Sequence, residues 1–113
     1  RATSRTTGRE MEAFESTVAL RGFEVDLKEG LLRDGDGVEV PLRSQTMAVL
    51  HLLCRQAGRV VTKDELMRAV WPDVIVTDDS LVQCIAEIRH ALRDHDHAIV
   101  QTLVKRGYRL IPA

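Results

Sequence analysis

The sequence has no excess of positive charge. Its 113 residues include 16 Lys and Arg against 17 Asp and Glu, which gives a formal net charge of -1. Proteins that bind nucleic acid without regard to sequence usually have a strongly basic surface, so this balance argues against such a protein. Any contact with nucleic acid has to come from cations that cluster locally.

Cysteine is also scarce, with Cys54 and Cys84 as the two residues of this type. Both lie within apolar helical patterns and not at the spacing of metal ligands, so we expect no disulfide framework. We predict that both thiols pack in the core of a domain that folds in a reducing compartment. The His-Asp-His run at 95–97 has no third ligand nearby in sequence, and we expect no metal and no other cofactor.

Long hydrophobic runs are missing. No apolar stretch approaches the length of a membrane span, and the opening RATSRTTGRE lacks the hydrophobic segment that follows the arginines of a signal peptide. Because the chain starts with Arg1 and not with Met, we expect it to be a piece of a longer protein. We expect this piece to be a cytoplasmic domain, whose full-length parent could be membrane-anchored.

Catalytic patterns are missing as well. The sequence has no Ser-His-Asp order, no phosphate-binding glycine loop and no paired carboxylates, so we do not expect an enzyme. It does contain 44% hydrophobic residues, enough for one compact core. We predict a flexible tail or linker at 1–17, which mixes Arg, Thr, Ser, Gly and Glu, and a single domain at 18–113.

The first part of this domain has the pattern of β-structure. VALRGFEVDL alternates around Leu20, Phe23 and Val25, and the repeated Asp-Gly at 34–37 is a strong hairpin signal. We therefore expect three short antiparallel strands before Pro41.

Three helices are predicted next. SQTMAVLHLLCRQAG repeats apolar residues at helical intervals and stops at Gly58, a C-terminal cap. After a brief strand at 59–61, Thr62 and Glu65 form a capping box that starts a second helix at Lys63, and this helix ends before Pro72. Asp78 is predicted to cap the third helix, DSLVQCIAEIRHALRD at 79–94. The core-facing stripe of this helix consists of Leu81, Ile85, Ile88 and Leu92.

The chain ends with the pattern of a β-hairpin. AIVQTLVKRGYRLIPA contains two β-rich runs around Lys105, Arg106 and Gly107, and the glycine occupies a position where a tight turn needs positive φ. The fold class is therefore predicted to be α+β, with an N-terminal antiparallel sheet, three helices and a C-terminal hairpin.

Four segments in this order resemble the winged helix-turn-helix effector domain of OmpR/PhoB-type response regulators and of CadC-like transcriptional regulators. They are PLRSQTMAVLHLL, GRVVTKDELMRAVWPD, VTDDSLVQCIAEIRHAL and IVQTLVKRGYRL, and the resemblance covers Leu20 to Ile111. It implies a bacterial transcriptional regulator that binds double-stranded DNA in a sequence-dependent way. The third helix would enter the major groove, and the hairpin, called the wing, would contact the minor groove or the backbone.

The resemblance also implies partners and contact residues. On the third helix the contacts fall on Asp79, Ser80, Gln83, Cys84, Ala86, Glu87 and Arg89, and on the wing they fall on Lys105, Arg106 and Tyr108. Better-known members often have arginines at the positions of Asp79, Ala86 and Glu87. The loop before the third helix would meet RNA polymerase through Trp71, Asp73, Val74, Ile75 and Thr77. A dimer on tandem half-sites and a sensory or receiver domain in the full-length chain are further implied.

The residues themselves support an exposed face on the third helix. A helical wheel places one set of side chains opposite the apolar stripe, namely Asp79, Gln83, Ala86, Glu87 and His90. Gln83 can pair with adenine and Glu87 can accept from cytosine N4, so few cations need not mean few contacts. Arg89 and Arg93 flank this face, where they could reach phosphates or instead pair with Asp94, Asp96 or Glu87. Considered alone, the face also fits an ordinary solvated helix.

The wing has the clearest electrostatic signal. From Ile99 onward the chain carries Lys105, Arg106 and Arg109 and no acidic residue, so we predict phosphate or minor-groove contact, with Arg106 foremost. Tyr108 could instead be an aromatic residue at the edge of the core. Further backbone candidates are Arg43, Thr62 and Lys63, because helix N-termini present free N–H groups to phosphate. The alternative function is a protein-interaction winged-helix module with little DNA affinity.

Overall fold

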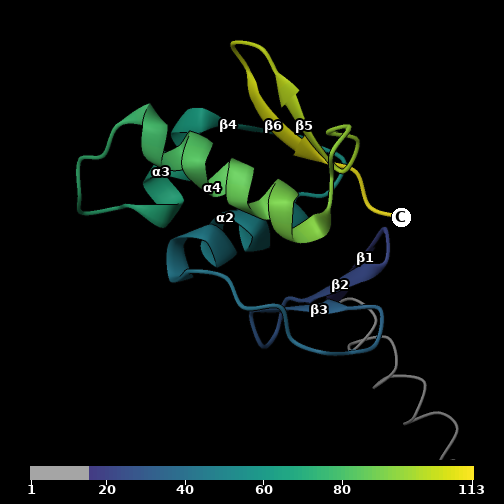
Figure 1. Cartoon of the computed structure of the whole chain (residues 1–113). Coiled ribbons are helices and arrows are strands. Elements are labelled where there is room, and N and C mark those ends of the chain that lie inside the picture. The colour runs from purple at the N-terminus through teal and green to yellow at the C-terminus, as the bar shows by residue number, and fades with distance from the viewer. Residues whose placement is uncertain (1–15) are drawn as a thin grey trace, which may run out of the picture.

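The computed structural model describes residues 16–113, and most of the predicted tail lies outside this range. Figure 1 shows a sheet at the N-terminal end, the helices in the middle and a second sheet from which a hairpin projects. This arrangement confirms the predicted α+β class and the predicted order of elements. Within residues 16–113, no helix combines the length and the apolar character needed to cross a membrane.

The N-terminal sheet consists of β1 (Thr17–Leu20), β2 (Phe23–Asp26) and β3 (Leu31–Asp34), paired antiparallel in that order. Of the apolar residues in the predicted alternation, Leu20 and Val25 are buried and Phe23 is half-buried. Leu32, which pairs with Val25 from β3, is buried as well. After β3, the Asp34 carboxylate accepts backbone N–H groups of Asp36 and Val38, which closes the predicted Asp-Gly turn. The last residue of the chain reaches back to this sheet, because the Ala113 N–H donates to the Ala19 carbonyl at 2.9 Å.

The second sheet has the order β4-β6-β5 and is formed by β4 (Val60–Thr62), β5 (Val100–Leu103) and β6 (Gly107–Leu110). Gly107 has the positive φ that the sequence predicts, at 151°, and glycine is also required here for a steric reason. A Cβ atom at this position would lie 2.1 Å from the Val61 carbonyl oxygen, so only glycine lets β6 approach β4. In the turn itself, Lys105 adopts the left-handed conformation, with a φ of 64°.

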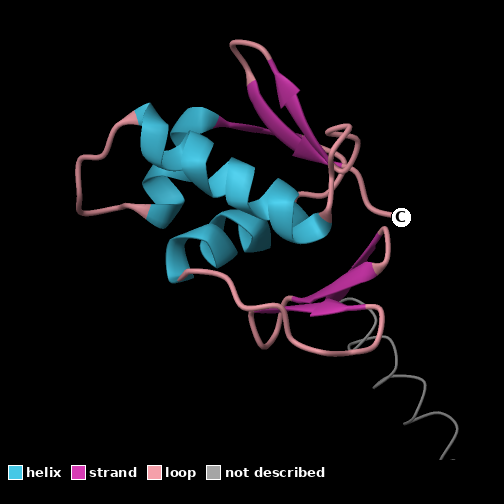
Figure 2. Ribbon diagram, in the orientation of Figure 1, coloured by secondary structure: helices cyan, strands magenta, loops and turns pink. Residues whose placement is uncertain are grey.

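The three helices are α2 (Ser44–Arg55), α3 (Lys63–Val70) and α4 (Asp78–Leu92), shown in cyan in Figure 2. The capping box of α3 is confirmed, since Thr62 Oγ1 accepts the Glu65 N–H at 3.1 Å and Glu65 Oε1 accepts the Thr62 N–H at 2.9 Å. It fixes the point at which β4 becomes α3.

Two predicted helix caps are wrong. Helix α2 ends at Arg55 with Gln56 as its C-cap, and Gly58 lies two residues further on. The Gly58 N–H donates to the Leu110 carbonyl at 2.8 Å, so this glycine joins the end of α2 to β6. Asp78 is the first residue of α4 and not its N-cap, which is Thr77 without a side-chain hydrogen bond.

The core lies between the helices and the two sheets. The predicted α4 stripe is confirmed, because Leu81, Ile85, Ile88 and Leu92 are all buried. Both cysteines are buried in the same cluster, as the sequence predicts. Burial raises the pKa of the Cys54 thiol to about 12, which keeps it protonated and unreactive at neutral pH.

Candidate nucleic-acid interface

Helix α4 presents a polar face opposite its buried stripe. Asp79, Gln83, Ala86 and His90 are exposed along this face, and Ser80 and Glu87 are half-buried at its edges. The helix-wheel prediction of an outward face is therefore right. The only cations of α4 itself are Arg89 and, next to its C-terminal end, Arg93, so positive charge must come from other elements.

One such cation is Arg43, which lies at the N-terminus of α2 and pairs with Glu87. Arg43 Nη2 lies 2.8 Å from Glu87 Oε2, and Arg43 Nε donates to Oε1 at 3.1 Å. The Thr46 hydroxyl also donates to Oε1. These contacts hold the pKa of the Glu87 carboxyl below its usual value, first through Thr46 and then through Arg43. Two donors occupy Oε1, so a cytosine amino group would bind at Oε2, beside Arg43.

Two of the contact residues implied by the resemblance are instead core residues. Cys84 is 1% exposed, because it points to the same side of α4 as Leu81 and Ile88. Tyr108 is 5% exposed, since β6 is the central strand of its sheet and packs under the helices. Burial raises the pKa of its phenol. This burial supports a place in the core for both side chains and conflicts with their assignment as DNA contacts.

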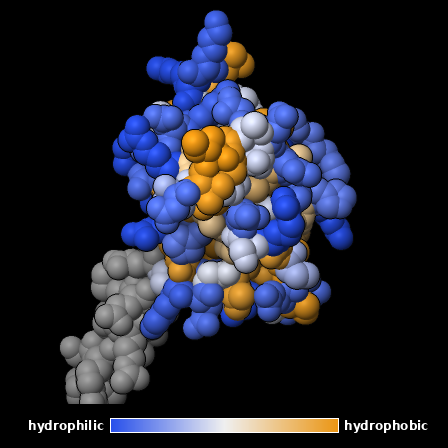
Figure 3. Space-filling model, turned by 90° about the vertical axis from the view of Figure 1, so that its left-hand side faces the viewer, coloured by the Kyte–Doolittle hydropathy of each residue, from blue (hydrophilic) through white to orange (hydrophobic). Residues whose placement is uncertain are grey.

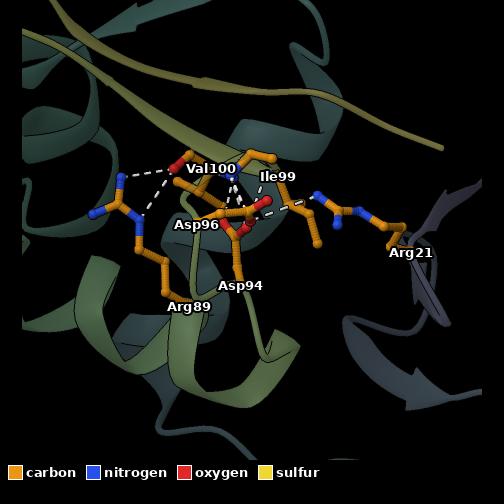
Figure 4. Close-up of polar contacts among 7 residues, drawn as sticks. Arg21, Arg89, Asp94, Asp96, Ile99 and Val100 are labelled. Atoms are coloured by element: carbon orange, nitrogen blue, oxygen red, sulfur yellow. Dashed lines mark hydrogen bonds and ion pairs between the residues drawn. The ribbon is translucent and has the colours of Figure 1, made fainter.

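Arg89 also faces the protein. Its guanidinium donates to the Val100 carbonyl from Nε at 3.0 Å and from Nη2 at 2.6 Å (Figure 4). Nη2 also donates to Thr102 Oγ1 at 2.8 Å. The side chain is half-buried, and burial lowers its pKa. The predicted phosphate contact by Arg89 conflicts with this geometry. Arg93 is exposed at the C-cap of α4, where it stays a candidate for phosphate.

Asp94 organises the connection from α4 to the wing. It is 2% exposed and accepts three backbone N–H groups, from Ala98 and Ile99 at Oδ1 and from Val100 at Oδ2. Burial favours the neutral acid, but these bonds and the nearby Arg89 charge outweigh it and lower the pKa of Asp94.

Asp96 next to it is exposed and lies 3.8 Å from Arg21 of the β1–β2 turn. Among residues 16–113, no cluster of three or more His, Cys, Asp or Glu could hold a metal ion.

The wing carries free cations at its tip. The hairpin of β5 and β6 projects beyond the helices in Figure 1, and the Arg106 N–H donates to the Leu103 carbonyl at 2.8 Å to close its turn. Lys105 and Arg106 are exposed, and neither side chain makes a hydrogen bond or ion pair within residues 16–113. Arg109 differs from them, because it donates to Gln101 Oε1 at 3.1 and 2.8 Å. Its charge is thereby held on the surface of the sheet, away from the tip.

The starts of α3 and α4 lie close together. Lys63 Nζ is 3.9 Å from Asp78 Oδ2, and both side chains are largely exposed, so this pair is loose. The Thr62 hydroxyl is occupied by its cap bond. Of the two predicted backbone contacts at this position, Lys63 is the better placed, because within the described part of the chain only this loose ion pair holds its ammonium group.

The loop between α3 and α4 carries exposed apolar side chains. Ile75 is 100% exposed and Val74 is mostly exposed, while the Trp71 ring is half-buried. Together with neighbouring side chains they line a shallow hollow, whose members are Met67, Arg68, Trp71, Pro72, Val74, Ile75 and Val76. Figure 3 shows an apolar patch on the face of the molecule to which this loop belongs. Asp73 and Thr77 are exposed at its borders.

Comparison with known proteins gives consistent matches. A family model described as "Transcriptional regulatory protein, C terminal" matches residues 37–110. The transcriptional regulator HilA of Salmonella typhi is 36% identical over 88 residues, which are 77% of this chain and 16% of that protein. The transcriptional activator CadC of Escherichia coli is 33% identical over 79 residues, 67% of this chain and 15% of the activator. The solved DNA-binding domain of E. coli CadC has a TM-score of 0.69 at 28% identity, covering 85% of this chain and 92% of that domain. The chain thus spans less than a fifth of the length of each of these two curated relatives.

Proposed function

The chain belongs to the family of C-terminal domains of transcriptional regulatory proteins, and from that membership we propose that it is the DNA-binding domain of a bacterial transcriptional regulator. Membership confirms the resemblance to OmpR/PhoB-type effector domains and places the chain among regulators and not among enzymes. The observation that carries the proposal is the pairing of one polar, exposed helix face on α4 with a hairpin whose tip has two unpaired cations.

We assign different roles to the helix and the wing. Gln83, exposed in the middle of the α4 face, is the candidate for contacts with base edges in the major groove. Lys105 and Arg106 are candidates for phosphate or minor-groove contact, because their side chains extend from the tip without protein partners. Asp79, Ala86 and His90 complete the face that would lie in the groove.

The acidic residues of α4 need an electrostatic account, because DNA is strongly negative. Glu87 is neutralised by Arg43, so the middle of the helix face carries one ion pair and no net charge. Asp79 and Asp78 lie in the first turn, where the helix dipole favours carboxylates. Attraction to DNA would therefore come mainly from the wing and from Arg93 and Lys63. Where the ion pair between Arg43 and Glu87 opens, Arg43 could also bind a phosphate.

The partners of the full-length protein are proposed on separate grounds. Since the matches cover only 16% of HilA and 15% of CadC, a sensory or receiver domain is proposed outside this chain. The exposed Val74 and Ile75 support the α3–α4 loop as a contact for RNA polymerase. A dimer on tandem half-sites and a cytoplasmic position of the domain follow from a role at promoters.

A protein-interaction module is the second candidate function. Val82 is 52% exposed on α4, next to the acidic first turn, and an apolar residue with carboxylates around it suits a basic protein partner better than DNA. In this case the wing would have a structural role only.

Selection of bound duplexes from a random library at moderate salt tests the proposal. The expected result is one enriched motif, with affinity that falls as salt rises. A matched pair of variants separates the role of α4 from that of the wing. Gln83→Ala should reduce discrimination between the enriched motif and random duplex, whereas Arg106→Ala should weaken binding to both duplexes. Absence of enrichment, together with salt-insensitive weak binding, would favour the protein-interaction module.

A further inference from the structure

We propose that Arg89 is a positioning residue that holds the wing at a fixed offset from α4, so that helix and wing act on DNA as one unit. The inference rests on the proposed DNA-binding function, but the contacts that carry it lie within the protein. Three hydrogen bonds join one guanidinium on α4 to two residues of β5 at 2.6, 2.8 and 3.0 Å.

The hydrogen bonds between α4 and the wing meet at Val100, the first residue of β5. Its N–H donates to Asp94 at 2.8 Å, and its carbonyl accepts from Arg89, so both backbone polar groups are held by side chains from α4 or its C-terminal end (Figure 4). Val100 is 0% exposed, so water cannot replace either partner without opening the structure. The attachment point of the wing is therefore fixed in position and in direction.

The sheet pattern explains why Val100 needs these partners. Strand β5 is an edge strand, paired on one side with β6. The Ile111 N–H donates to the Ile99 carbonyl, so the next pair, Val100 and Leu110, directs its backbone groups away from the partner strand. On the free edge of β5, Arg89 and Asp94 occupy the place that a further strand would take.

These contacts bear on how far the wing can move. On its other side β6 pairs with β4, which is joined directly to α3, so β6 is anchored without Arg89. The strand that leads to the tip, β5, has no such second neighbour. Loss of Arg89 would therefore leave the domain folded but release β5 and the tip cations Lys105 and Arg106 from their set distance to α4.

A double-mutant cycle on DNA affinity tests the inference. One phosphate contact changes the binding constant by about eightfold at 0.1 M salt, since affinity scales with salt to a power of about -0.9 per contact. Arg106→Ala should therefore weaken binding of the selected duplex about eightfold in the wild-type background. In the Arg89→Gln background, where the wing is not held in place, the same substitution should cost less than about twofold, which is about one third of that effect in free energy or less.

The opposite outcome has a clear signature. If Arg89 contacts a phosphate directly and independently, its effect and that of Arg106 will multiply, with no coupling between them. Arg93→Gln is the matched control, because Arg93 belongs to the same helix end, is exposed, and should give independent effects with Arg106→Ala. Full coupling for Arg93 as well would show that the cycle reports general destabilisation, and would overturn the assignment.

A second variant avoids any change in charge. Thr102→Val removes the hydroxyl that accepts from Arg89 and should couple to Arg106→Ala with the same sign and a smaller magnitude. The Thr102→Val cycle also tests the positioning role if Arg89→Gln does not fold, which urea denaturation would reveal. No coupling for Thr102→Val in a folded protein would count against the positioning role.

The inference and the proposed function fail in different ways. If the wild-type domain binds no duplex, the proposed function fails, and the helix–wing link is then measured by amide hydrogen exchange. Arg89→Gln should speed exchange in β5 by about tenfold or more while exchange in α4 stays within about threefold, as expected for local and not global opening. Equal exchange in wild type and variant would overturn the link itself.

Discussion

Removal of the Asp94 carboxylate should be among the most damaging single changes in the domain. The side chain is buried and accepts the N–H groups of Ala98, Ile99 and Val100 at 2.9, 3.0 and 2.8 Å. In Asp94→Ala, at least the two buried donors, those of Ile99 and Val100, lose their acceptor. An unsatisfied buried donor costs about 1–3 kcal/mol, so we expect a loss of about 2–6 kcal/mol in the free energy of unfolding.

The isosteric variant Asp94→Asn separates the contributions of the individual hydrogen bonds to this loss of stability. In Asp94→Asn the amide oxygen can still accept from Ala98 and Ile99, but the amide nitrogen then faces the Val100 N–H, which is also a donor. One unsatisfied donor predicts a loss of about 1–3 kcal/mol, roughly half that of Asp94→Ala. Urea denaturation followed by the fluorescence of Trp71, the single tryptophan, gives both values.

Asp96→Ala is the control, because Asp96 lies in the same loop but is largely exposed, and its loss should change stability by no more than about 0.5 kcal/mol. Equal denaturation midpoints for wild type and Asp94→Ala would refute the reasoning. So would an Asp94→Asn variant as unstable as Asp94→Ala, because the hydrogen-bond count would then not determine the cost.

The same carboxylate predicts a dependence on pH. Its pKa is lower in the folded state than in the unfolded chain, so its contribution to stability is present above the unfolded value of about 4. This contribution is lost as pH falls through the folded pKa. The difference in unfolding free energy between wild type and Asp94→Asn should therefore shrink on acidification below about pH 4, and a constant difference would contradict the assignment.

Further predictions concern the interface and the second sheet. Gln83→Ala should cost about 1–3 kcal/mol on the preferred duplex and leave the salt dependence unchanged, as measured by titration at several salt concentrations. Glu87→Gln should free Arg43 and strengthen binding to random duplex at low salt, and unchanged binding would place this pair outside the interface. Ile75→Asp should leave DNA affinity within about threefold, or about 0.7 kcal/mol, but impair activation in a reporter assay. Gly107→Ala should prevent the native pairing of β4 with β6 and give little folded protein by circular dichroism, because the added Cβ meets the Val61 carbonyl at 2.1 Å.

Much of the fold could be predicted because its signals are local. The capping box of Thr62 and Glu65 lies within one turn, and the stripe through Ile85 and Ile88 repeats at the helical period, so each is visible in a short window of sequence. The cap predictions at Gly58 and Asp78 failed because a nearby residue serves as the cap instead. Gly58 is needed for its contact with Leu110, 52 residues away along the chain.

The interface could be predicted only in part, because side-chain direction depends on distant segments. Glu87 and Arg43 are 44 positions apart, and no pattern in the sequence links them. Cys84 was assigned to DNA by its position in the family motif, but the rotation of α4 on the core turns it inward. Arg89 lies at the edge of the exposed face of α4. Its guanidinium turns toward β5 because the unpaired Val100 carbonyl accepts its hydrogen bonds. Exposed residues far from any packed element, such as Arg106, were easier to predict.

The hydrogen bond between Ala113 and Ala19 determines how the domain can be tethered. It brings the last residue of the chain beside β1, close to the point where the described chain begins, and at the opposite end of the hairpin from the wing tip (Figure 1). A tag or a further domain attached after Ala113 would thus leave the molecule from the region of β1. Surface immobilisation through the C-terminus should accordingly leave DNA binding unchanged, with the wing tip facing away from the support.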